Sequence, residues 1–156
     1  MPFPIRQLKA SEFPELLREI PDKPKQLFIR GELPPRDVKL LCVVGSRSCS
    51  VYGRRSTQQL IAGLARYPVA IVSGMALGID SEAHKAALDV GLPTIAVLPS
   101  SLDDISLYPS SNKGLAQRIL ARGGALISEN KAPWKAMLHS FPERNRVMSG
   151  MSTATL

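Results

Sequence analysis

Residues Leu40–Val44 read LLCVV, and the chain leaves this run directly through GSRSCS, residues 45–50. A short run of Leu and Val without polar alternation is typical of a strand covered on both faces, as in a parallel sheet. The pattern returns as VAIV, TIAVL and ALI, at residues 69–72, 94–98 and 125–127. The runs end at residues 44, 72, 98 and 127, so they are 28, 26 and 29 residues apart. This spacing predicts a repeated unit of one strand, one helix and two short connections.

Apolar residues at helical spacing lie between these runs. There are three such sets: Leu60, Ile61, Leu64 and Ala65; Ala83, Ala86, Ala87 and Val90; Leu115, Ala116, Ile119 and Leu120. Strands joined through helices are parallel, with right-handed crossovers. The predicted fold class is therefore α/β, a Rossmann-like, doubly wound parallel sheet. The regular spacing of the runs predicts a fifth strand near STATL, residues 152–156, where the sequence stops. We therefore expect the last strand or strands of the sheet to be missing from this chain.

The N-terminal residues do not follow the repeat. The string ASEFPELLREI, residues 10–20, predicts a short helix, and the Pro-rich segment 21–35 predicts an extended lead-in. We therefore expect two parts. An N-terminal lead-in covers residues 1–36, and a Rossmann-like domain, incomplete at its C-terminal end, covers residues 37–156.

The composition limits the class of protein. With 156 residues, 44% of them apolar, the chain can bury one core. Twenty basic and thirteen acidic residues give a net charge of +7, which favours a phosphate-rich partner. The two cysteines, Cys42 in an apolar run and Cys49 in a loop, do not suggest a disulfide framework. No apolar leader and no bilayer-length run occurs, so we expect a cytoplasmic protein without a membrane partner.

The loop after the first run, residues 45–56, contains Gly, Ser and Arg but no acidic residue. Gly45 permits a tight turn out of the strand, Ser46 offers a hydroxyl and an amide to an anion, and Arg47 offers a fork suited to phosphate. The alternative is that Arg47 points into water. The loop lacks the dinucleotide-binding pattern G-x-G-x-x-G, and it lacks the Gly-Lys-Ser/Thr of a nucleotide-binding P-loop. We therefore expect no cofactor.

The loop after the second run contains SGMALGID, residues 73–80, which begins with Ser73 and Gly74. Gly74 permits close backbone approach, and Asp80 is expected to cap the helix that carries His84. This capping role and the helical spacing explain Asp80 and His84 without catalysis. No nucleophile with a supporting base accompanies them, and no cluster has metal-ligand spacing. We therefore expect no catalytic residues and no metal site.

The segment FPERNR, residues 141–146, is the third candidate. On a strand Arg144 and Arg146 share a face, whereas on a helix they lie about 200° apart, so that one can meet a ligand while the other pins the sheet. Asn145 can cap a helix or hold a loop carbonyl. Phe141 is either a core anchor or an exposed stacking platform for a base, and both alternatives remain open.

Other aromatic residues lie near the same predicted edge of the sheet. Trp134 stands between Lys131 and Lys135 and has the same two alternatives as Phe141. Tyr52 and Tyr108 add possible stacking surface. Aromatic residues interleaved with cations favour an unpaired nucleic acid strand as the ligand.

Several strings of this chain occur in the order found in a known family. They are GSR (45–47), Tyr52-Gly53, SGMALGID (73–80), Ala83-His84, TIAVLPSSLD (94–103), YPSSN (108–112), ISEN (127–130) and FPERNRVMSGMS (141–152). On these motifs the chain resembles the DNA-processing protein A (DprA/Smf) family over nearly its whole length.

The resemblance implies a cytoplasmic bacterial protein that binds single-stranded DNA, shields it and helps to load the RecA recombinase in transformation and recombination. It also implies a homodimer in the full-length protein and no catalytic residues. Its implied phosphate contacts are Gly45, Ser46, Arg47, Ser73 and Gly74. Its implied DNA path includes Phe141, Arg144, Asn145 and Arg146.

The alternative is an enzyme, a nucleotide-binding phosphoribohydrolase of the lysine-decarboxylase-like group. Such a protein would use a first loop similar to G-S-R to hold a nucleotide phosphate. The diagnostic string P-G-G-x-G-T-x-x-E of that group does not occur in these residues. The FPERNR segment and the positive net charge favour DNA binding over this alternative.

Overall fold

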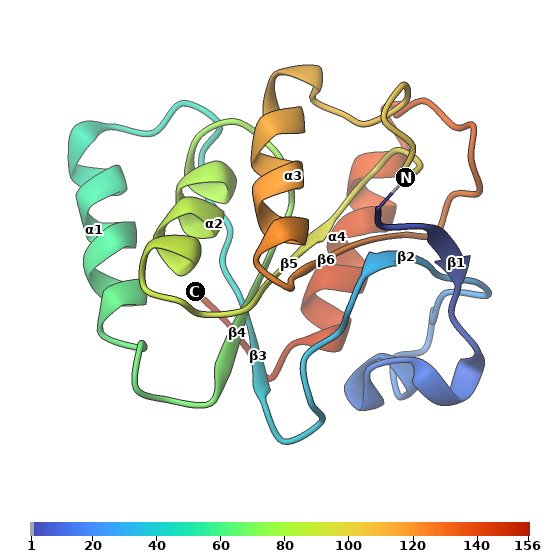
Figure 1. The fold of residues 1–156 in the computed structure, drawn as a ribbon, viewed down its shortest axis with the longest axis horizontal. Coiled ribbons are helices and arrows are strands. Elements are labelled where there is room, and N and C mark those ends of the chain that lie inside the picture. Colours follow the sequence, from blue (N-terminus) through green and yellow to red (C-terminus); the bar gives the residue numbers. More distant parts are fainter. Residues whose placement is uncertain (1) are drawn as a thin grey trace.

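The computed structural model describes residues 2–156. Within them one seven-stranded sheet has the order β1-β2-β6-β5-β4-β3-β7 (Figure 1). The strands are β1 (Ile5–Gln7), β2 (Phe28–Gly31), β3 (Lys39–Cys42), β4 (Val69–Ser73), β5 (Thr94–Val97), β6 (Ala125–Ser128) and β7 (Ala154–Thr155). Strands β3 to β7 run parallel, while β1 and β2 form an antiparallel edge beside β6.

Helices cover both faces of the sheet (Figure 1). The helices α1 (Val51–Ala62), α2 (Ile79–Asp89) and α3 (Lys113–Ala121), the last preceded by the 3-10 turn η3 (Ser110–Asn112), cover one face. The helix α4 (Ser140–Met151) and the 3-10 turns η1 (Ala10–Glu12) and η2 (Glu15–Arg18) cover the other. The prediction of a Rossmann-like, doubly wound and mostly parallel α/β sheet is confirmed.

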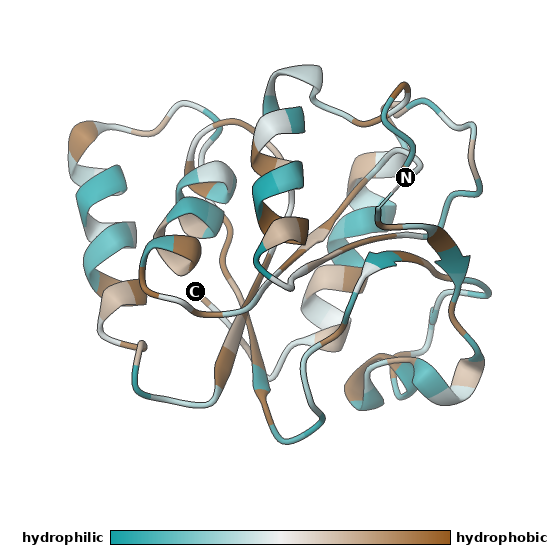
Figure 2. Ribbon diagram, viewed as in Figure 1, coloured by the Kyte–Doolittle hydropathy of each residue, from teal (hydrophilic) through white to brown (hydrophobic). Residues whose placement is uncertain are grey.

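Alternate residues of each central strand enter different apolar clusters. Val97 of β5 packs with Leu17 of η2 and Val147 of α4, whereas its neighbour Ala96 packs with Ile119 of α3. Figure 2 shows the central strands as the most apolar part of the ribbon. Burial on both faces explains why these strands read as uninterrupted apolar runs.

The four predicted apolar runs became β3, β4, β5 and β6, with strand ends within two residues of those predicted. The strand expected to be missing after them is present, because β7 pairs in parallel with β3 through Leu41 and Ala154, and through Cys42 and Thr155. Only two residues of β7 take part. Its position agrees with the fifth strand that the spacing of the apolar runs placed near residues 152–156.

The predicted helix at residues 10–20 is wrong. Two 3-10 turns, η1 and η2, occupy this segment, and Pro14 lies between them. The residue before a proline avoids the helical region, and Phe13 accordingly has a ψ of 143°. The N-terminal lead-in, residues 1–36, also contains β1 and β2, which belong to the same sheet as the repeat. The division at residue 36 remains a prediction.

One buried arginine ties β2 to the long loop after β5. Arg30 is only 1% exposed, and its guanidinium donates to the carbonyl oxygens of Phe3 and Leu102 and to Asp104 Oδ1, at 3.0, 3.2 and 2.6 Å. Three acceptors compensate for the burial of this charge. The interaction fixes the start of residues 98–112, which carry Tyr108 into the site described next.

Candidate functional site

The loops that follow β3 and β4 pack backbone against backbone. A Cβ atom on Gly78 would lie 2.2 Å from Ser46 O and 2.5 Å from Arg47 O, and Gly78 has a φ of +82°. The amide of Ile79 donates to Ser46 O at 3.1 Å. A Cβ on Gly45 would in turn lie 2.6 Å from Ile79 Cγ1. The glycines therefore hold Ser46 and Arg47 in place at the carboxyl end of β3.

Arg47 lies over an aromatic pair. Its Cζ is 5.0 Å from the centroid of the Phe141 ring, and Tyr108 meets Phe141 edge-on with centroids 5.7 Å apart and an interplanar angle of 79°. Both contacts fit the charge distribution of an aromatic ring. Phe141 is half-buried and belongs to none of the three apolar clusters among residues 2–156. Its surroundings match a platform better than a core anchor.

These residues border a hollow of about 190 Å³, which we call the rim pocket. Its lining comes from four loops or helices and consists of Arg47, Met75, Ala76, Leu77, Pro99, Tyr108, Pro109, Phe141 and Arg144. Two arginines, two aromatic rings and no carboxylate make the lining suitable for a flat, negatively charged ligand.

Arg144 lies beneath the rim pocket and is 7% exposed. Its Nη1 donates to Val97 O and its Nε to Asn145 Oδ1, both at 3.0 Å. A Cβ on Gly74 would lie 2.1 Å from Arg144 Nη1 and 2.4 Å from Asp80 Oδ2, so the absence of a side chain at Gly74 leaves room for both charged groups. Burial raises the pKa of Asp80, and the positive charge of Arg144 opposes that rise.

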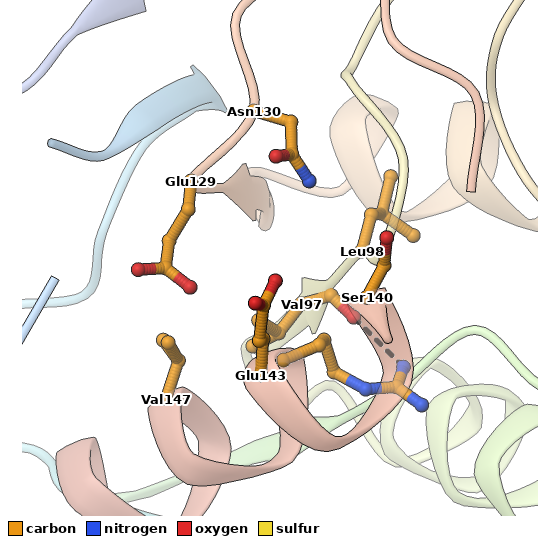
Figure 3. Close-up of a pocket in the computed structure, with 8 residues that line it drawn as sticks. Val97, Leu98, Glu129, Asn130, Ser140, Glu143 and Val147 are labelled. Carbon is orange, nitrogen blue, oxygen red and sulfur yellow. Dashed lines mark hydrogen bonds between the residues drawn. The ribbon is translucent and has the colours of Figure 1, made fainter. Parts of the chain in front are cut away.

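Figure 3 shows a second, smaller hollow, which Arg144 also lines. Its volume is about 10 Å³, and its lining includes Glu129, Asn130 and Glu143. A space of this size holds about one water molecule at most. The carboxylates of Glu129 and Glu143 face it in Figure 3, which also makes it unsuited to an anion. We therefore place the candidate site at the rim pocket.

Arg146 does not reach the rim pocket. Its Nη2 donates to Glu129 Oε1 at 2.7 Å and its Nε to Asp22 Oδ2 at 3.1 Å. Arg144 and Arg146 lie on α4, where they point in different directions. Arg146 thus pins α4 to the loop after β6 and to the segment before β2.

The remaining predicted site residues differ in what they can offer. Ser73 is fully buried and donates its hydroxyl to Val43 O at 2.6 Å, so that this hydroxyl is not free for a ligand. Ser46 is exposed, and its Oγ is engaged with the backbone of Ser48. Asn145 is exposed and accepts from Arg144.

The expectation that Asp80 caps α2 is wrong. Helix α2 begins at Ile79 with Gly78 in the cap position and no side-chain cap, so Asp80 already lies inside the first turn. Its buried carboxylate instead lies near the positive charge of Arg144, which opposes the rise that burial causes in the pKa of Asp80. The sequence could not reveal this pairing, because it depends on where α4 lies.

His84 is a buried, structural residue. Its Nε2 lies 2.7 Å from Gly74 O and its Nδ1 lies 2.6 Å from Thr94 Oγ1. In the neutral ring one nitrogen can donate to the carbonyl while the other accepts from the hydroxyl. Burial, assisted by the charge of Arg144, lowers the pKa of His84 to about 4. His84 thus supports Gly74 from below the rim pocket.

We expect His84 to make the chain less stable in mild acid. The unfolded state binds a proton below pH 6.5 and the folded state only below about 4, so the unfolded state is favoured as the pH falls through this window. The loss of unfolding free energy should reach about 3 kcal/mol near the lower pKa. Urea unfolding between pH 7.5 and about 4 measures it. His84→Gln should remove this part of the dependence and His139→Gln, at an exposed position, should keep it; equal curves for the two variants would contradict the assignment.

Among residues 2–156 no helix is long and apolar enough to cross a membrane. The same residues contain no group of three or more His, Cys, Asp or Glu side chains arranged to hold a metal ion.

The parallel sheet, with a basic and aromatic pocket at the carboxyl ends of its strands, defines a Rossmann-like protein whose candidate site lies where such folds bind ligands. Residues 5–156 match the model of DNA recombination-mediator protein A, and the chain belongs to that family. The resemblance found in the motifs is therefore confirmed.

Relatives with known sequences or structures agree with this membership. The chain is 44% identical to protein Smf of Escherichia coli over 147 residues, which cover 94% of this chain and 39% of that protein. It matches the X-ray structure of DNA processing protein A from Streptococcus pneumoniae with a TM-score of 0.84 and 34% identity, over 98% of this chain and 53% of the other. The name of the Streptococcus pneumoniae protein describes DNA processing.

A second similar structure is DNA processing protein A from Helicobacter pylori, described for its single-stranded DNA binding mode. The TM-score is 0.83 with 30% identity, over 98% of this chain and 68% of that one. The chain spans about half the length, or less, of the curated relatives it matches.

Proposed function

We propose that this chain binds single-stranded DNA, without base preference and without catalysis, at the rim pocket. The observation that carries the proposal is the position of the Arg47 guanidinium 5.0 Å above the Phe141 ring, beside Tyr108. A cation and an aromatic face at one place match the phosphate and the base of one nucleotide. Family membership and the described ligand of the Helicobacter pylori protein support the same ligand class.

The pocket favours an unpaired strand over a duplex for a geometric reason. A base can stack on Phe141 only when its own face is free, and bases inside a duplex are already stacked. Among residues 2–156, the helix that borders the pocket is α4, and it packs against the sheet with Val147 and Met148 buried, unlike a helix that projects into a major groove. Arg47 supplies the phosphate contact from an exposed position, and buried Arg144 adds positive potential beneath it.

The predicted site residues have different roles in this proposal. Gly45, Ser46 and Gly74 shape the backbone around the phosphate, and Asn145 orients Arg144. Arg146 and Ser73 act indirectly, through the ion pairs of Arg146 and the buried hydrogen bond of Ser73.

We infer that, in the cytoplasm, the protein protects single-stranded DNA and assists the loading of RecA during recombination and transformation. The full-length protein acts as a homodimer in this proposal. The description of its family as a recombination mediator supports this part of the proposal. RecA-dependent strand exchange on DNA coated with single-strand binding protein would test it directly. Acceleration by the full-length protein is expected.

Arg47→Ala should weaken binding to an oligothymidylate by about 1.5–3 kcal/mol, because one charge-assisted contact is lost. The slope of log K against log salt should fall in magnitude by about 0.7, the value for one single-strand phosphate. Arg47→Lys should keep most of the slope and lose part of the affinity. Fluorescence anisotropy at several salt concentrations measures both quantities, for the single strand and for the matching duplex.

Arg66→Ala is the matched control, since Arg66 is also exposed but lies between α1 and β4 at the opposite edge of the sheet. Its affinity and slope should equal those of the parent chain. A folded Arg47→Ala protein with unchanged affinity would remove the support for a phosphate contact at Arg47. Release of base or phosphate from a nucleoside monophosphate, lost in Arg47→Ala, would instead favour the phosphoribohydrolase alternative.

A further inference from the structure

Trp134 lies in the loop after β6, residues 129–139, and its backbone is held firmly. Ser101 N donates to Trp134 O at 3.0 Å, and Trp134 N donates to Ser101 Oγ at 2.8 Å. Ser101 is itself fully buried in the loop after β5. The two loops therefore lie side by side at the same edge of the sheet as the rim pocket (Figure 1). This anchoring fixes the backbone of Trp134 in a loop without regular secondary structure.

The indole is exposed although its backbone is fixed. Trp134 is 39% exposed and is the one tryptophan in the chain. Large aromatic residues normally bury their apolar surface, so an anchored and exposed tryptophan indicates a contact surface. Further along the same loop Met137 and Leu138 are 52% and 91% exposed. The rigid backbone means that little conformational freedom would be lost when a ligand covers this surface.

The charge around Trp134 is positive. Lys131 and Lys135 are exposed, and within residues 2–156 neither forms an ion pair. No acidic residue occurs in residues 131–140. On the adjoining loop Asp103 accepts from the Ser101 hydroxyl and the Ser106 amide, and Asp104 pairs with Arg30. The carboxylates already have partners within the chain and need no cationic ligand. The two exposed lysines suit the phosphates of a nucleic acid strand.

We propose that Trp134 is a second stacking position for the DNA strand, with Lys131 and Lys135 contacting the phosphates on either side of the stacked base. This rests on the proposed function, because the strand would run from the rim pocket along the loop after β6. The ligand at this position is an unpaired nucleobase of any type, since every base offers a π face. The site lies outside the lining of the rim pocket, so it lengthens the DNA path.

Because the chain has one tryptophan, its intrinsic emission reports this contact directly. We expect an oligothymidylate of about 20 nucleotides, longer than one typical single-strand site, to quench the emission as it saturates the protein. The midpoint should agree with that measured by anisotropy of a labelled oligonucleotide. An abasic oligonucleotide of equal length and charge should bind more weakly and leave the emission nearly unchanged.

Trp134→Leu keeps an apolar side chain but removes the π face, and it should weaken binding by about 5- to 150-fold. Trp134→Phe should recover most of that loss. Lys131→Gln and Lys135→Gln should each lower the magnitude of the salt slope by about 0.7. The matched aromatic control is Tyr67→Leu, because Tyr67 is 61% exposed between α1 and β4, at the far edge of the sheet. It should bind like the parent chain.

The failures of the two proposals can be told apart. If the parent chain binds the oligonucleotide but its emission stays constant, or if Trp134→Leu binds as tightly as Tyr67→Leu, the second stacking position is wrong and the rim pocket stands. If the parent chain does not bind single-stranded DNA at all, both proposals are wrong. A melting curve for each variant confirms that the compared proteins are folded.

Discussion

An Arg144→Ala variant is expected to lose about 3–5 kcal/mol of the free energy of unfolding, a large part of the stability of a domain of this size. The residue is 7% exposed, and its Nη1 donates to Val97 O at 3.0 Å. Truncation leaves that carbonyl without this donor. It also removes the positive charge that opposes the rise in the pKa of Asp80, so the buried carboxylate becomes costly to ionise.

Urea unfolding at pH 7.5 measures the loss, and Arg146→Ala is its control. Arg146 also pairs with acids but is 27% exposed, so its removal should cost only about 1 kcal/mol. The double variant Arg144→Met/Asp80→Asn should be more stable than Arg144→Met alone, because no charged group then remains buried without a partner. If Arg144→Ala and Arg146→Ala lose equal amounts, buried Arg144 is not the support that we infer.

The sequence predicted the parallel part of the fold because burial on both faces leaves uninterrupted apolar runs, as in LLCVV before Gly45. It missed β2 as a strand of the sheet for the opposite reason. The strand FIRG contains a charged residue, Arg30, whose burial is possible only because Asp104 and two carbonyls lie nearby in the folded chain. Such compensation depends on long-range contacts, which a local pattern does not contain.

The candidate site was predictable in its location but not in its pairings. The carboxyl ends of parallel strands meet at one edge, so Arg47 and the SGMALGID loop were expected to lie together. Nothing in FPERNR tells which arginine turns inward. The helix that carries it places Arg144 against Val97 and Asp80, and directs Arg146 to other partners.

A Gly78→Ala variant should lose more than about 3 kcal/mol of unfolding free energy, from two additive causes. Gly78 has a φ of +82° and a ψ of −131°, a backbone region that costs a non-glycine residue about 1–3 kcal/mol. The added Cβ would also lie 2.2 Å from Ser46 O and 2.5 Å from Arg47 O. Both of those atoms belong to rigid backbone, so the loop that presents Arg47 must move.

Gly91→Ala separates the two causes, because Gly91 has a similar φ of +76° but no atom within 4 Å of the added Cβ. Its loss should be only the backbone cost, about 1–2 kcal/mol. Gly78→Ala should in addition weaken binding of an oligothymidylate, measured by anisotropy at a temperature where both variants are folded, whereas Gly91→Ala should not. Equal losses of stability in the two variants would mean that the Ser46–Arg47 backbone yields easily. The position of Arg47 over Phe141 would then have to be fixed by the cation–π contact alone.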